Sequence, residues 1–305
     1  MSTPSVIIKN LSKSYGKVDA ISDISLTVDK GEIFGCIGPD GAGKTSLLRI
    51  LVTLLLPDKG ECSVGGLEVV KDFKKIRKIV GYMPGRFSLY QDLSVEENLN
   101  FFASIFKTTI EENYYLIEDI YKQIEPFKKR LAGRLSGGMK QKLALSCALI
   151  HKPEILFLDE PTTGVDAVSR KEFWDMLKRL KEWGITIMVS TPYMDEAALC
   201  DRVALMQEGN IMSIDTPAGI INSHKKLLAS VRTNDMFRLV KDLLSLSDCY
   251  SAYRFGATVH YTPIGKVIET ELIEEQLAKK GHGDIEVVPI SPGVEDCFME
   301  LMTKD

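Results

Sequence analysis

The stretch GPDGAGKTS, residues 38–46, is the most informative motif for the fold of this chain. It fits the pattern G-x-x-x-x-G-K-S/T and lies between an apolar run, EIFGCI, and a helix-like run, SLLRILV. Its glycines would let the backbone wrap closely around phosphate oxygens, with N–H groups and a helix N-terminus facing the anion. Lys44 is expected to reach the β and γ phosphates, and Thr45 to hold Mg²⁺. A glycine turn with an accidental lysine is the alternative, and the strand–loop–helix context disfavours it.

A second motif, EILFLDEP at residues 154–161, brings two carboxylates to the end of an apolar strand. The carboxyl ends of parallel strands are where the sites of α/β proteins gather. Asp159 is expected to hold the water shell of Mg²⁺, and Glu160 to polarise the attacking water. A solvated turn is the alternative for this acidic pair. Together with the first motif, the pair predicts a nucleotide hydrolase.

Strand-like and helix-like runs alternate around these motifs and predict an α/β protein. Residues 20–28 alternate at Ile24, Leu26 and Val28, which indicates antiparallel strands near the N-terminus. The runs EIFGCI, EILFLD and GITIMVS instead suit buried strands of a mainly parallel sheet. The apolar segment LLRILVTLLLP, residues 47–57, is too short to cross a bilayer and is expected to be a buried helix. We therefore expect a P-loop NTPase core.

Two changes of pattern divide the chain. A helical insert is expected at about residues 86–150, with a capping box from Ser94 to Glu97 in DLSVEENLNFF. After about residue 220 the runs follow the order β, α, β, β, α, β, which suits a small α+β domain of ferredoxin-like type. The segment PGVEDCFMELM is expected to form a last helix. The predicted domains are a nucleotide-binding domain at 1–220 and a C-terminal accessory domain at 221–305.

Composition limits the partners and the compartment. The 305 residues carry a net charge of -4, which gives no electrostatic case for nucleic acid as the main partner. The N-terminus, MSTPSVIIKNLSKSYG, lacks the charged start and apolar core of a secretory signal, so a cytosolic chain is expected. Cysteines and histidines are dispersed, so no metal site built from protein ligands alone is expected.

A third motif, LSGGMKQ at residues 135–141, points to a family. Combined with the first two motifs in this order and separation, it resembles the signature of the ABC family of ATPases, over about residues 5–220. In that family the Ser-Gly-Gly turn and the following helix bind the γ-phosphate held by a second subunit. The resemblance assigns this role to Ser136, Gly137, Gly138 and Met139, with a helix expected to begin near Met139. An isolated Ser-Gly-Gly turn is otherwise a common helix N-cap.

The resemblance also implies a set of nucleotide contacts. Tyr15, in KSYG, looks like the aromatic residue that stacks on adenine, although a lone tyrosine is more often a core or edge residue. Asp166, in TTGVD, looks like part of the loop that crosses to the partner subunit, with a turn aspartate as the alternative. Mg²⁺ is expected at Thr45 and Asp159, and Glu160 is the expected catalytic residue. The residues expected to contact ATP are Tyr15, Gly38, Pro39, Asp40, Gly41, Ala42, Gly43, Lys44, Thr45 and Ser46.

Two positions depart from the family's pattern. In VGYMPGRFSLY, Gly85 replaces a glutamine that touches Mg²⁺ and the attacking water. In STPYMDEAALCDRV, Pro192 replaces a histidine that reaches the γ-phosphate, and proline offers neither a side-chain donor nor an N–H. Loss of one preorganised donor costs about 3 to 4 kcal/mol of transition-state stabilisation, on the order of 10² to 10³ in rate. Arg86 and Gln91 are alternative donors, although neither is at the right position. Slow hydrolysis with retained binding is expected.

The resemblance implies a subunit of a transporter. An ATPase without membrane spans must pass its work to transmembrane permease subunits, at the cytoplasmic face of the membrane, and this chain looks most like the ATPases of ABC-2 type exporters for drugs and lipids. Phe87, Tyr90, Phe101 and Phe102 are candidate docking residues, with helix core as the alternative. A second ABC cassette is the other expected partner, in a heterodimer or a homodimer. The rival function is a soluble ATP-gated clamp in translation or repair, which usually has two cassettes in one chain, a coiled-coil arm or a basic surface.

Overall fold

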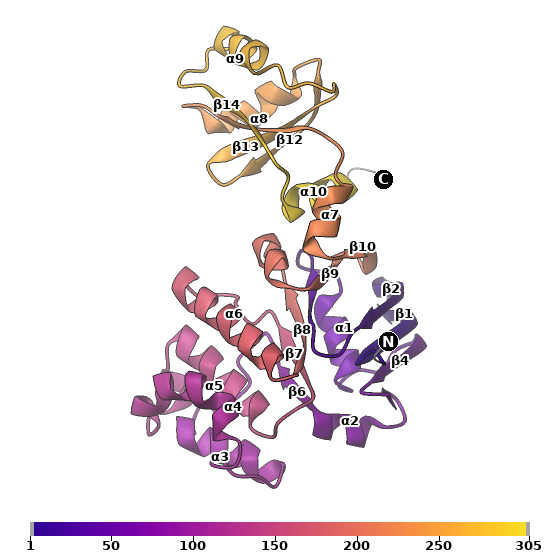
Figure 1. Cartoon of the computed structure of the whole chain (residues 1–305), viewed down its shortest axis with the longest axis vertical. Helices are drawn as coiled ribbons and strands as arrows, with labels where there is room; N and C mark the ends of the chain where they lie inside the picture. Colours follow the sequence, from indigo (N-terminus) through magenta and orange to yellow (C-terminus); the bar gives the residue numbers. More distant parts are fainter. Residues whose placement is uncertain (1–2, 303–305) are drawn as a thin grey trace. The chain divides into compact units, whose positions relative to one another are not determined.

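The computed structural model describes residues 3–302. The chain divides into two compact units, the first ending at Pro217 and the second beginning at Ala218. Figure 1 colours the first unit from indigo to orange and the second from orange to yellow. Each unit has a hydrophobic core of its own. None of the helices within residues 3–302 combines the length and the apolar character that a membrane span requires.

A six-stranded sheet with the order β10-β9-β3-β8-β7-β6 forms the centre of the first unit. Its strands are β3 (Ile33–Ile37), β6 (Val80–Met83), β7 (Ile155–Asp159), β8 (Thr186–Thr191), β9 (Arg202–Gln207) and β10 (Asn210–Asp215). Neighbouring strands are parallel, except that the edge strand β10 is antiparallel to β9. The strands β3, β7 and β8 are buried along their whole length, because both faces of the sheet are covered. The predicted mainly parallel sheet is confirmed.

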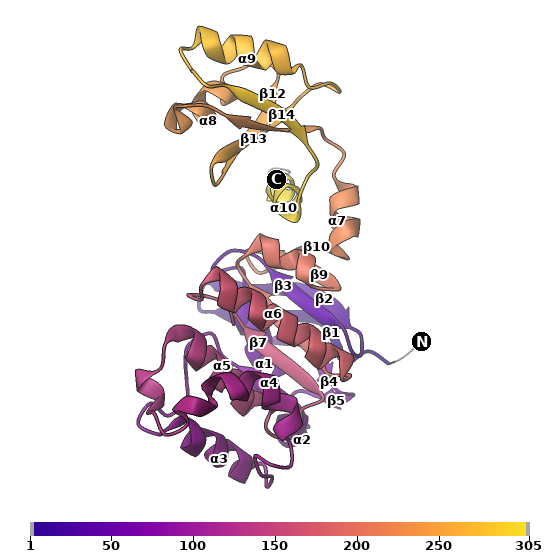
Figure 2. The ribbon, with the colours of Figure 1, turned by 60° about the vertical axis from the view of Figure 1, so that its left-hand side comes forward.

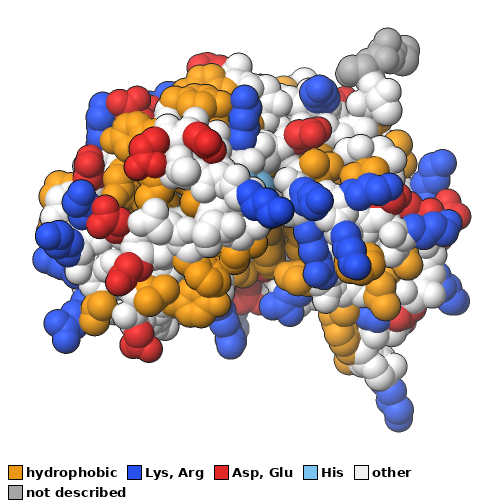
Figure 3. All heavy atoms as spheres, turned by 90° about the horizontal axis from the view of Figure 1, so that it is seen from below, with side chains coloured by type: hydrophobic (Ala, Val, Ile, Leu, Met, Phe, Trp, Pro, Cys, Tyr) orange, Lys and Arg blue, Asp and Glu red, His pale blue; other side chains and the backbone are white. Residues whose placement is uncertain are grey.

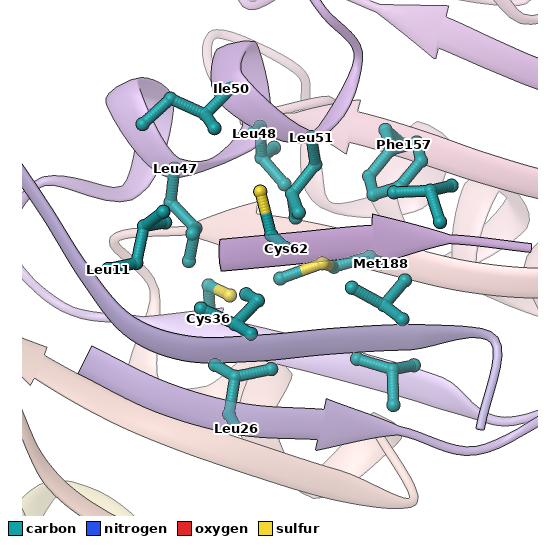
Figure 4. Packing of buried hydrophobic residues seen from close by; sticks show 14 of the residues in the cluster. Leu11, Leu26, Cys36, Leu47, Leu48, Ile50, Leu51, Cys62, Phe157 and Met188 are labelled. Carbon is teal, nitrogen blue, oxygen red and sulfur yellow. The ribbon is translucent and has the colours of Figure 1, made fainter. Parts of the chain in front are cut away.

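An antiparallel sheet with the order β2-β1-β4-β5 lies beside the parallel one. Its strands are β1 (Val6–Tyr15), β2 (Val18–Val28), β4 (Lys59–Val64) and β5 (Leu67–Glu68). Ile24, Leu26 and Val28 of β2 are buried, while the residues between them are exposed, as the alternation predicts. Figure 4 shows Leu26 in the same core as Leu47 and residues of the parallel sheet. This shared core fixes the helix that begins at Lys44 and the loop before it.

Helices cover both faces of the parallel sheet. The α-helices of the first unit are α1 (Lys44–Leu51), α2 (Phe73–Ile79), α3 (Val95–Ile105), α4 (Tyr114–Ile124), α5 (Gly137–Leu149) and α6 (Ala167–Glu182). Short 3-10 turns lie at Glu125–Phe127, Ala132–Arg134 and Met194–Leu199. Figures 1 and 2 show α6 on the side of the sheet opposite to α1, and α3, α4 and α5 grouped together. The predicted capping box is present, since Ser94 N donates to Glu97 and Glu97 N donates to the Ser94 hydroxyl.

The prediction of a buried helix over residues 47–57 is wrong in its second half. α1 ends at Leu51, and Thr53 adopts a left-handed backbone (φ 65°) that a right-handed helix cannot continue. Leu54 and Leu56 then lie outside the helix and are 59% and 65% exposed. The apolar composition therefore predicted burial for two leucines that are exposed, because the left-handed backbone at Thr53 ends the helix early.

The second unit has the predicted order β, α, β, β, α, β. Its elements are β11 (Leu228–Arg232), α8 (Met236–Leu244), β12 (Cys249–Phe255), β13 (Thr258–Pro263), α9 (Thr270–Lys279) and β14 (Glu286–Ile290). The strand order β12-β13-β11-β14, with antiparallel neighbours, is that of the ferredoxin-like fold. The predicted last helix is α10 (Val294–Met302), and α7 (Pro217–Ser223) precedes the first strand.

A pH dependence of stability is expected from His151, which follows α5. Its ring stacks on Phe106 with ring centroids 3.8 Å apart, and its Nε2 lies 3.0 Å from the carbonyl oxygen of Val80. Burial lowers the pKa of the His151 imidazole below its ordinary value. As the pH falls through about 6.5, the unfolded chain binds a proton that the folded chain does not, so stability decreases on the acid side.

The measurement is the urea midpoint of the parent chain and of His151→Phe at about pH 7.5 and about pH 5.5, which bracket the ordinary histidine pKa. Phenylalanine keeps the ring stacking and does not titrate. The variant should lose less stability between the two pH values than the parent does. Equal losses in both chains would contradict the expectation.

Candidate functional site

The phosphate-binding loop GPDGAG joins the carboxyl end of β3 to the start of α1. Gly38 N donates to the carbonyl oxygen of Thr191 at 3.3 Å, which ties the loop to the end of β8. A Cβ atom on Gly38 would lie 2.1 Å from the carbonyl oxygen of Met206, and one on Gly43 (φ 96°) would lie 2.2 Å from that of Ala20. Only glycine fits at these two positions. Because glycine has no side chain, the backbone of the loop can approach a bound group closely there.

Lys44 is the first residue of α1 and is only 3% exposed. Its Nζ donates to the carbonyl oxygens of Gly38 at 2.7 Å and Pro39 at 2.9 Å. The same Nζ lies 3.4 Å from Oε1 of Glu160. A buried ammonium is stable only with such partners. The contacts hold a positive charge over the loop, at the place where an anion would bind.

Asp159, at the end of β7, accepts two hydroxyl hydrogen bonds on one carboxylate oxygen. Thr45 Oγ1 donates to Oδ1 at 2.9 Å, and Ser190 Oγ donates to the same atom at 2.7 Å. Ser190 was not predicted as a site residue from the sequence. Its position at the carboxyl end of a buried strand was the available signal, because such strand ends gather in one site.

Glu160 has a left-handed backbone, with φ 48°. Its N–H donates to the carbonyl oxygen and the hydroxyl of Ser190, at 3.0 Å and 3.1 Å. A non-glycine residue in this region costs about 1 to 3 kcal/mol, and such strain persists where the surrounding structure fixes it. In this conformation the Glu160 carboxylate lies beside the Lys44 ammonium, with Oε1 3.4 Å from Nζ.

A cleft of about 430 Å³ opens above the loop. Tyr15 is 48% exposed, and its hydroxyl lies 3.4 Å from that of Ser46 at the start of α1. The cleft brings together most of the predicted ATP contacts with Glu160, and adds two residues of β2. Its lining residues are Tyr15, Val18, Ala20, Asp40, Gly41, Ala42, Gly43, Lys44, Thr45, Ser46 and Glu160.

The Ser-Gly-Gly turn does not line this cleft. Ser136 is the N-cap of α5, and its hydroxyl accepts from Met139 N at 3.4 Å. The helix begins at Gly137, two residues earlier than expected, because Ser136 already caps it. Ser136 and Gly137 are exposed. The positive end of α5 therefore lies outside the chain's own cleft and is partly exposed to solvent.

Asp166 also lies outside the cleft. Its Oδ1 accepts from Val168 N at 3.1 Å and Ser169 N at 3.0 Å, so this exposed aspartate is the N-cap of α6. The hydrogen bonds from Ser169 hold the pKa of the Asp166 carboxyl below its ordinary value. Within the single chain, Asp166 shapes the loop that follows Glu160.

The two altered positions lie close to the predicted metal and phosphate sites. A Cβ atom on Gly85 would lie 3.1 Å from the carbonyl oxygen of Asp159, so this position is adjacent to the end of β7. Pro192 directly follows β8, the strand between β3 and β7. Neither Arg86 nor Gln91 is among the residues that line the cleft.

Comparison with known proteins agrees with this geometry. A family model described as "ABC transporter" matches residues 21–163. The probable multidrug ABC transporter ATP-binding protein YbhF of Escherichia coli is 34% identical over 304 residues, which are 97% of this chain and 52% of that protein. The chain thus spans about half the length of this relative. The Nod factor export ATP-binding protein I of a Rhizobium species is 35% identical over 312 residues, covering 100% of this chain and 99% of that protein.

A solved structure gives the same result. The dimeric ATP-binding cassette MJ0796, in a post-hydrolysis state with ADP and Pi, has a TM-score of 0.63 and 28% identity. The match covers 69% of this chain and 98% of that one. With the loop, the strand-end carboxylates and the Ser-Gly-Gly turn all in place, this chain belongs to the ATP-binding proteins of ABC transporters, a family of P-loop ATPases.

Proposed function

We propose that this chain binds Mg-ATP and hydrolyses it slowly, as the ATP-binding subunit of an ABC exporter. The observation that carries the proposal is the cleft in which Lys44, Thr45 and Glu160 converge above the phosphate-binding loop. Backbone N–H groups and the N-terminus of α1 suit the phosphates, and the exposed ring of Tyr15 suits adenine.

Thr45 and Asp159 are the residues that would hold Mg²⁺. Both supply oxygen atoms, which Mg²⁺ prefers, and these oxygens lie 2.9 Å apart. Ser190 fixes the orientation of the Asp159 carboxylate through a second hydrogen bond. The metal would offset the charge of the phosphates.

Glu160 is the residue that would polarise the attacking water. Its strained backbone and its proximity to Lys44 support this role. Slow hydrolysis follows from Gly85 and Pro192, because neither supplies a side-chain donor beside the γ-phosphate.

A second cassette would complete the site. Ser136, Gly137, Gly138 and Met139 are placed at the N-terminus of α5, away from the chain's own cleft. In a face-to-face pair this turn would bind the γ-phosphate held by the partner, and the partner's turn would serve this cleft. The loop that begins at Asp166 would lie at the same interface. The pair is a heterodimer with one slow site or a homodimer with two.

Permease subunits are the proposed membrane partners, and the chain would be peripheral on the cytoplasmic face. Tyr90 is 51% exposed and its ring meets that of Phe101 edge-on, with centroids 4.8 Å apart. Leu54 and Leu56 add exposed apolar surface in the first unit. Figure 3 shows hydrophobic side chains around a hollow in the face seen from below, where Figure 1 shows α2 and α3. The export and multidrug functions in the relatives' names support the exporter assignment.

The experiment is purification of the tagged chain from native membranes, with identification of the proteins that remain bound. Co-purified chains with several apolar runs of about 20 residues would support the exporter function. Recovery of ribosomes or DNA in place of membrane proteins would favour the clamp function. The net charge of -4 does not favour that function, because it gives no electrostatic attraction to nucleic acid.

A chain truncated after Ser223 is expected to remain soluble and to bind ATP with unchanged affinity. The reason is that the cleft and its supporting core belong to the first unit, while the second unit has a separate core. The measurement is equilibrium binding of a fluorescent ATP analogue to both chains. Aggregation of the truncated chain, or loss of binding, would mean that the accessory unit is integral to the cassette.

A further inference from the structure

The end of β8 and the segment that follows it contact the phosphate-binding loop and the loop that carries Glu160. The carbonyl oxygen of Thr191, the last residue of β8, accepts from Gly38 N of the phosphate-binding loop. Tyr193 N donates to the hydroxyl of Thr191 at 3.1 Å, which fixes the backbone on both sides of Pro192. Glu196, five residues after Thr191, contacts the loop that carries Glu160.

Glu196 is an unusual residue for its location, because its carboxylate is almost completely buried, with 1% of the side chain exposed. Thr162 Oγ1 donates to its Oε1 at 2.7 Å. The guanidinium of Arg170 lies beside the same oxygen, with Nε at 3.7 Å. Oε2 makes no hydrogen bond to any residue within 3–302. A carboxylate buried with so few partners is expensive to keep, so its retention calls for an explanation.

Arg170 joins this carboxylate to α6. The centre of its guanidinium lies 4.2 Å from the ring centroid of Tyr193, and Nη1 lies 3.7 Å from Oδ2 of Asp195. Arg170 is four residues after Asp166, the N-cap of α6, and its N–H donates to the carbonyl oxygen of Asp166. The position of the Asp166 loop is therefore linked to Glu196 through one guanidinium.

Thr162 provides the link to Glu160. Glu160 N is held by Ser190, and Thr163 N donates to the carbonyl oxygen of Glu160 at 3.2 Å. Thr162, two residues after Glu160, is fully buried and is anchored by Glu196. A strained residue keeps its conformation only when the surrounding structure fixes it. Ser190 fixes the chain before the Glu160 side chain, and Glu196 fixes it afterwards.

We propose that Glu196 is a positioning residue for ATP hydrolysis, which holds Glu160 at the γ-phosphate through Thr162 and holds the Asp166 loop through Arg170. The inference rests on the proposed function, because it concerns the rate of that reaction. Since Pro192 cannot donate to the phosphate, Glu196 supplies the side-chain contact by which this segment acts on the catalytic loop.

The experiment compares Glu196→Gln, Thr162→Val and their double variant with the full-length parent. Glutamine keeps an acceptor for the Thr162 hydroxyl but removes the charge beside Arg170. Valine removes the hydroxyl and keeps the shape. Asp175→Asn is the control, since Asp175 is an exposed carboxylate on α6 outside this contact network. Two quantities are measured for each variant. The first is the rate of single-turnover hydrolysis with protein in excess over ATP, and the second is the affinity for nucleotide.

Each single variant should slow hydrolysis by about 10-fold to 100-fold, as small misplacements of a catalytic group do. The nucleotide Kd should stay within about 2-fold of the parent value, because phosphate-loop contacts are untouched. The double variant should be slower than either single variant, because Glu196→Gln removes the charge beside Arg170 and Thr162→Val removes the hydrogen bond from Thr162. Asp175→Asn should hydrolyse ATP at the parent rate.

A parent rate in Glu196→Gln, or a loss of affinity as large as the loss of rate, would overturn the positioning role. If Glu196→Gln does not fold, Thr162→Val decides the question in the same way. The Glu160→Gln variant distinguishes a failure of the Glu196 role from a failure of the proposed ATPase function. Lost turnover in Glu160→Gln with a parent rate in Glu196→Gln overturns this inference alone. Parent turnover in Glu160→Gln overturns the proposed function itself.

Discussion

Replacement of Lys44 by alanine is expected to weaken Mg-ATP binding by about 100-fold, since charged hydrogen bonds contribute about 1.5 to 3 kcal/mol each. Among the cleft-lining residues within the described range 3–302, Lys44 is the only one with a cationic side chain. Its ammonium is buried, and the carbonyl groups of Gly38 and Pro39 hold it over the loop. Without it, the phosphates would face Glu160 with no opposing side-chain charge.

The measurement is equilibrium titration with a fluorescent ATP analogue, with thermal unfolding as a check that the variant is folded. Lys71→Ala is the matched control, because the Lys71 side chain is 77% exposed and pairs with Glu68 on the surface, and Lys71 is not among the residues that line the cleft. The control should bind nucleotide like the parent. Unchanged affinity in a folded Lys44→Ala chain would refute the assignment of the cleft as the ATP site.

The parts of the site that the sequence predicted are those whose chemistry and geometry reside in one short segment. The glycine pattern before Lys44 encodes a turn that only glycine can form, as the close approach at Gly38 and Gly43 shows. The carboxylates of Asp159 and Glu160 were predictable for a related reason, because a buried parallel strand delivers its last residues to a known edge of the sheet.

Contacts between distant segments were not predictable in this way. Ser190 meets Asp159 across 31 positions, and Glu196 meets Thr162 across 34. No local pattern of one sequence marks such a pair, since burial of a glutamate runs against its usual preference. The prediction that Leu54 and Leu56 lie in a buried helix was wrong for the opposite reason. The hydrophobic pattern was present, but it did not reveal the left-handed backbone at Thr53 that ends the helix.

Combined replacement of Gly85 by glutamine and Pro192 by histidine is expected to raise ATP turnover on the order of 10²-fold to 10³-fold, the usual contribution of a preorganised donor to the transition state. Position 192 follows β8, between the strand that leads to Lys44 and the strand that ends in Asp159. A donor there would lie between the loop and Glu160. The Tyr193 N–H bond to Thr191 remains available to hold the segment after Pro192 is removed.

Position 85 leaves little room for a side chain. A Cβ atom would lie 3.1 Å from the carbonyl oxygen of Asp159, so the chain near Gly85 must shift by a few tenths of an ångström. Gly85 is exposed and lies in the irregular segment between β6 and α3, which can absorb such a shift. Pro192→His alone should therefore give most of the gain, and Gly85→Gln alone should give less.

The assay is steady-state phosphate release by the purified chain, and each restored variant is repeated with Glu160→Gln to show that the gain uses the same carboxylate. The test also bears on the dimer. A partner cassette that carries glutamine and histidine at these positions would have a complete site, because Ser136, Gly137 and Gly138 of this chain are exposed or half-buried at the start of α5. The pair would then have one fast and one slow site. Brisk, Glu160-dependent turnover by the unaltered chain, with no gain on restoration, would refute slow hydrolysis at its own site and with it the reason to expect an asymmetric pair.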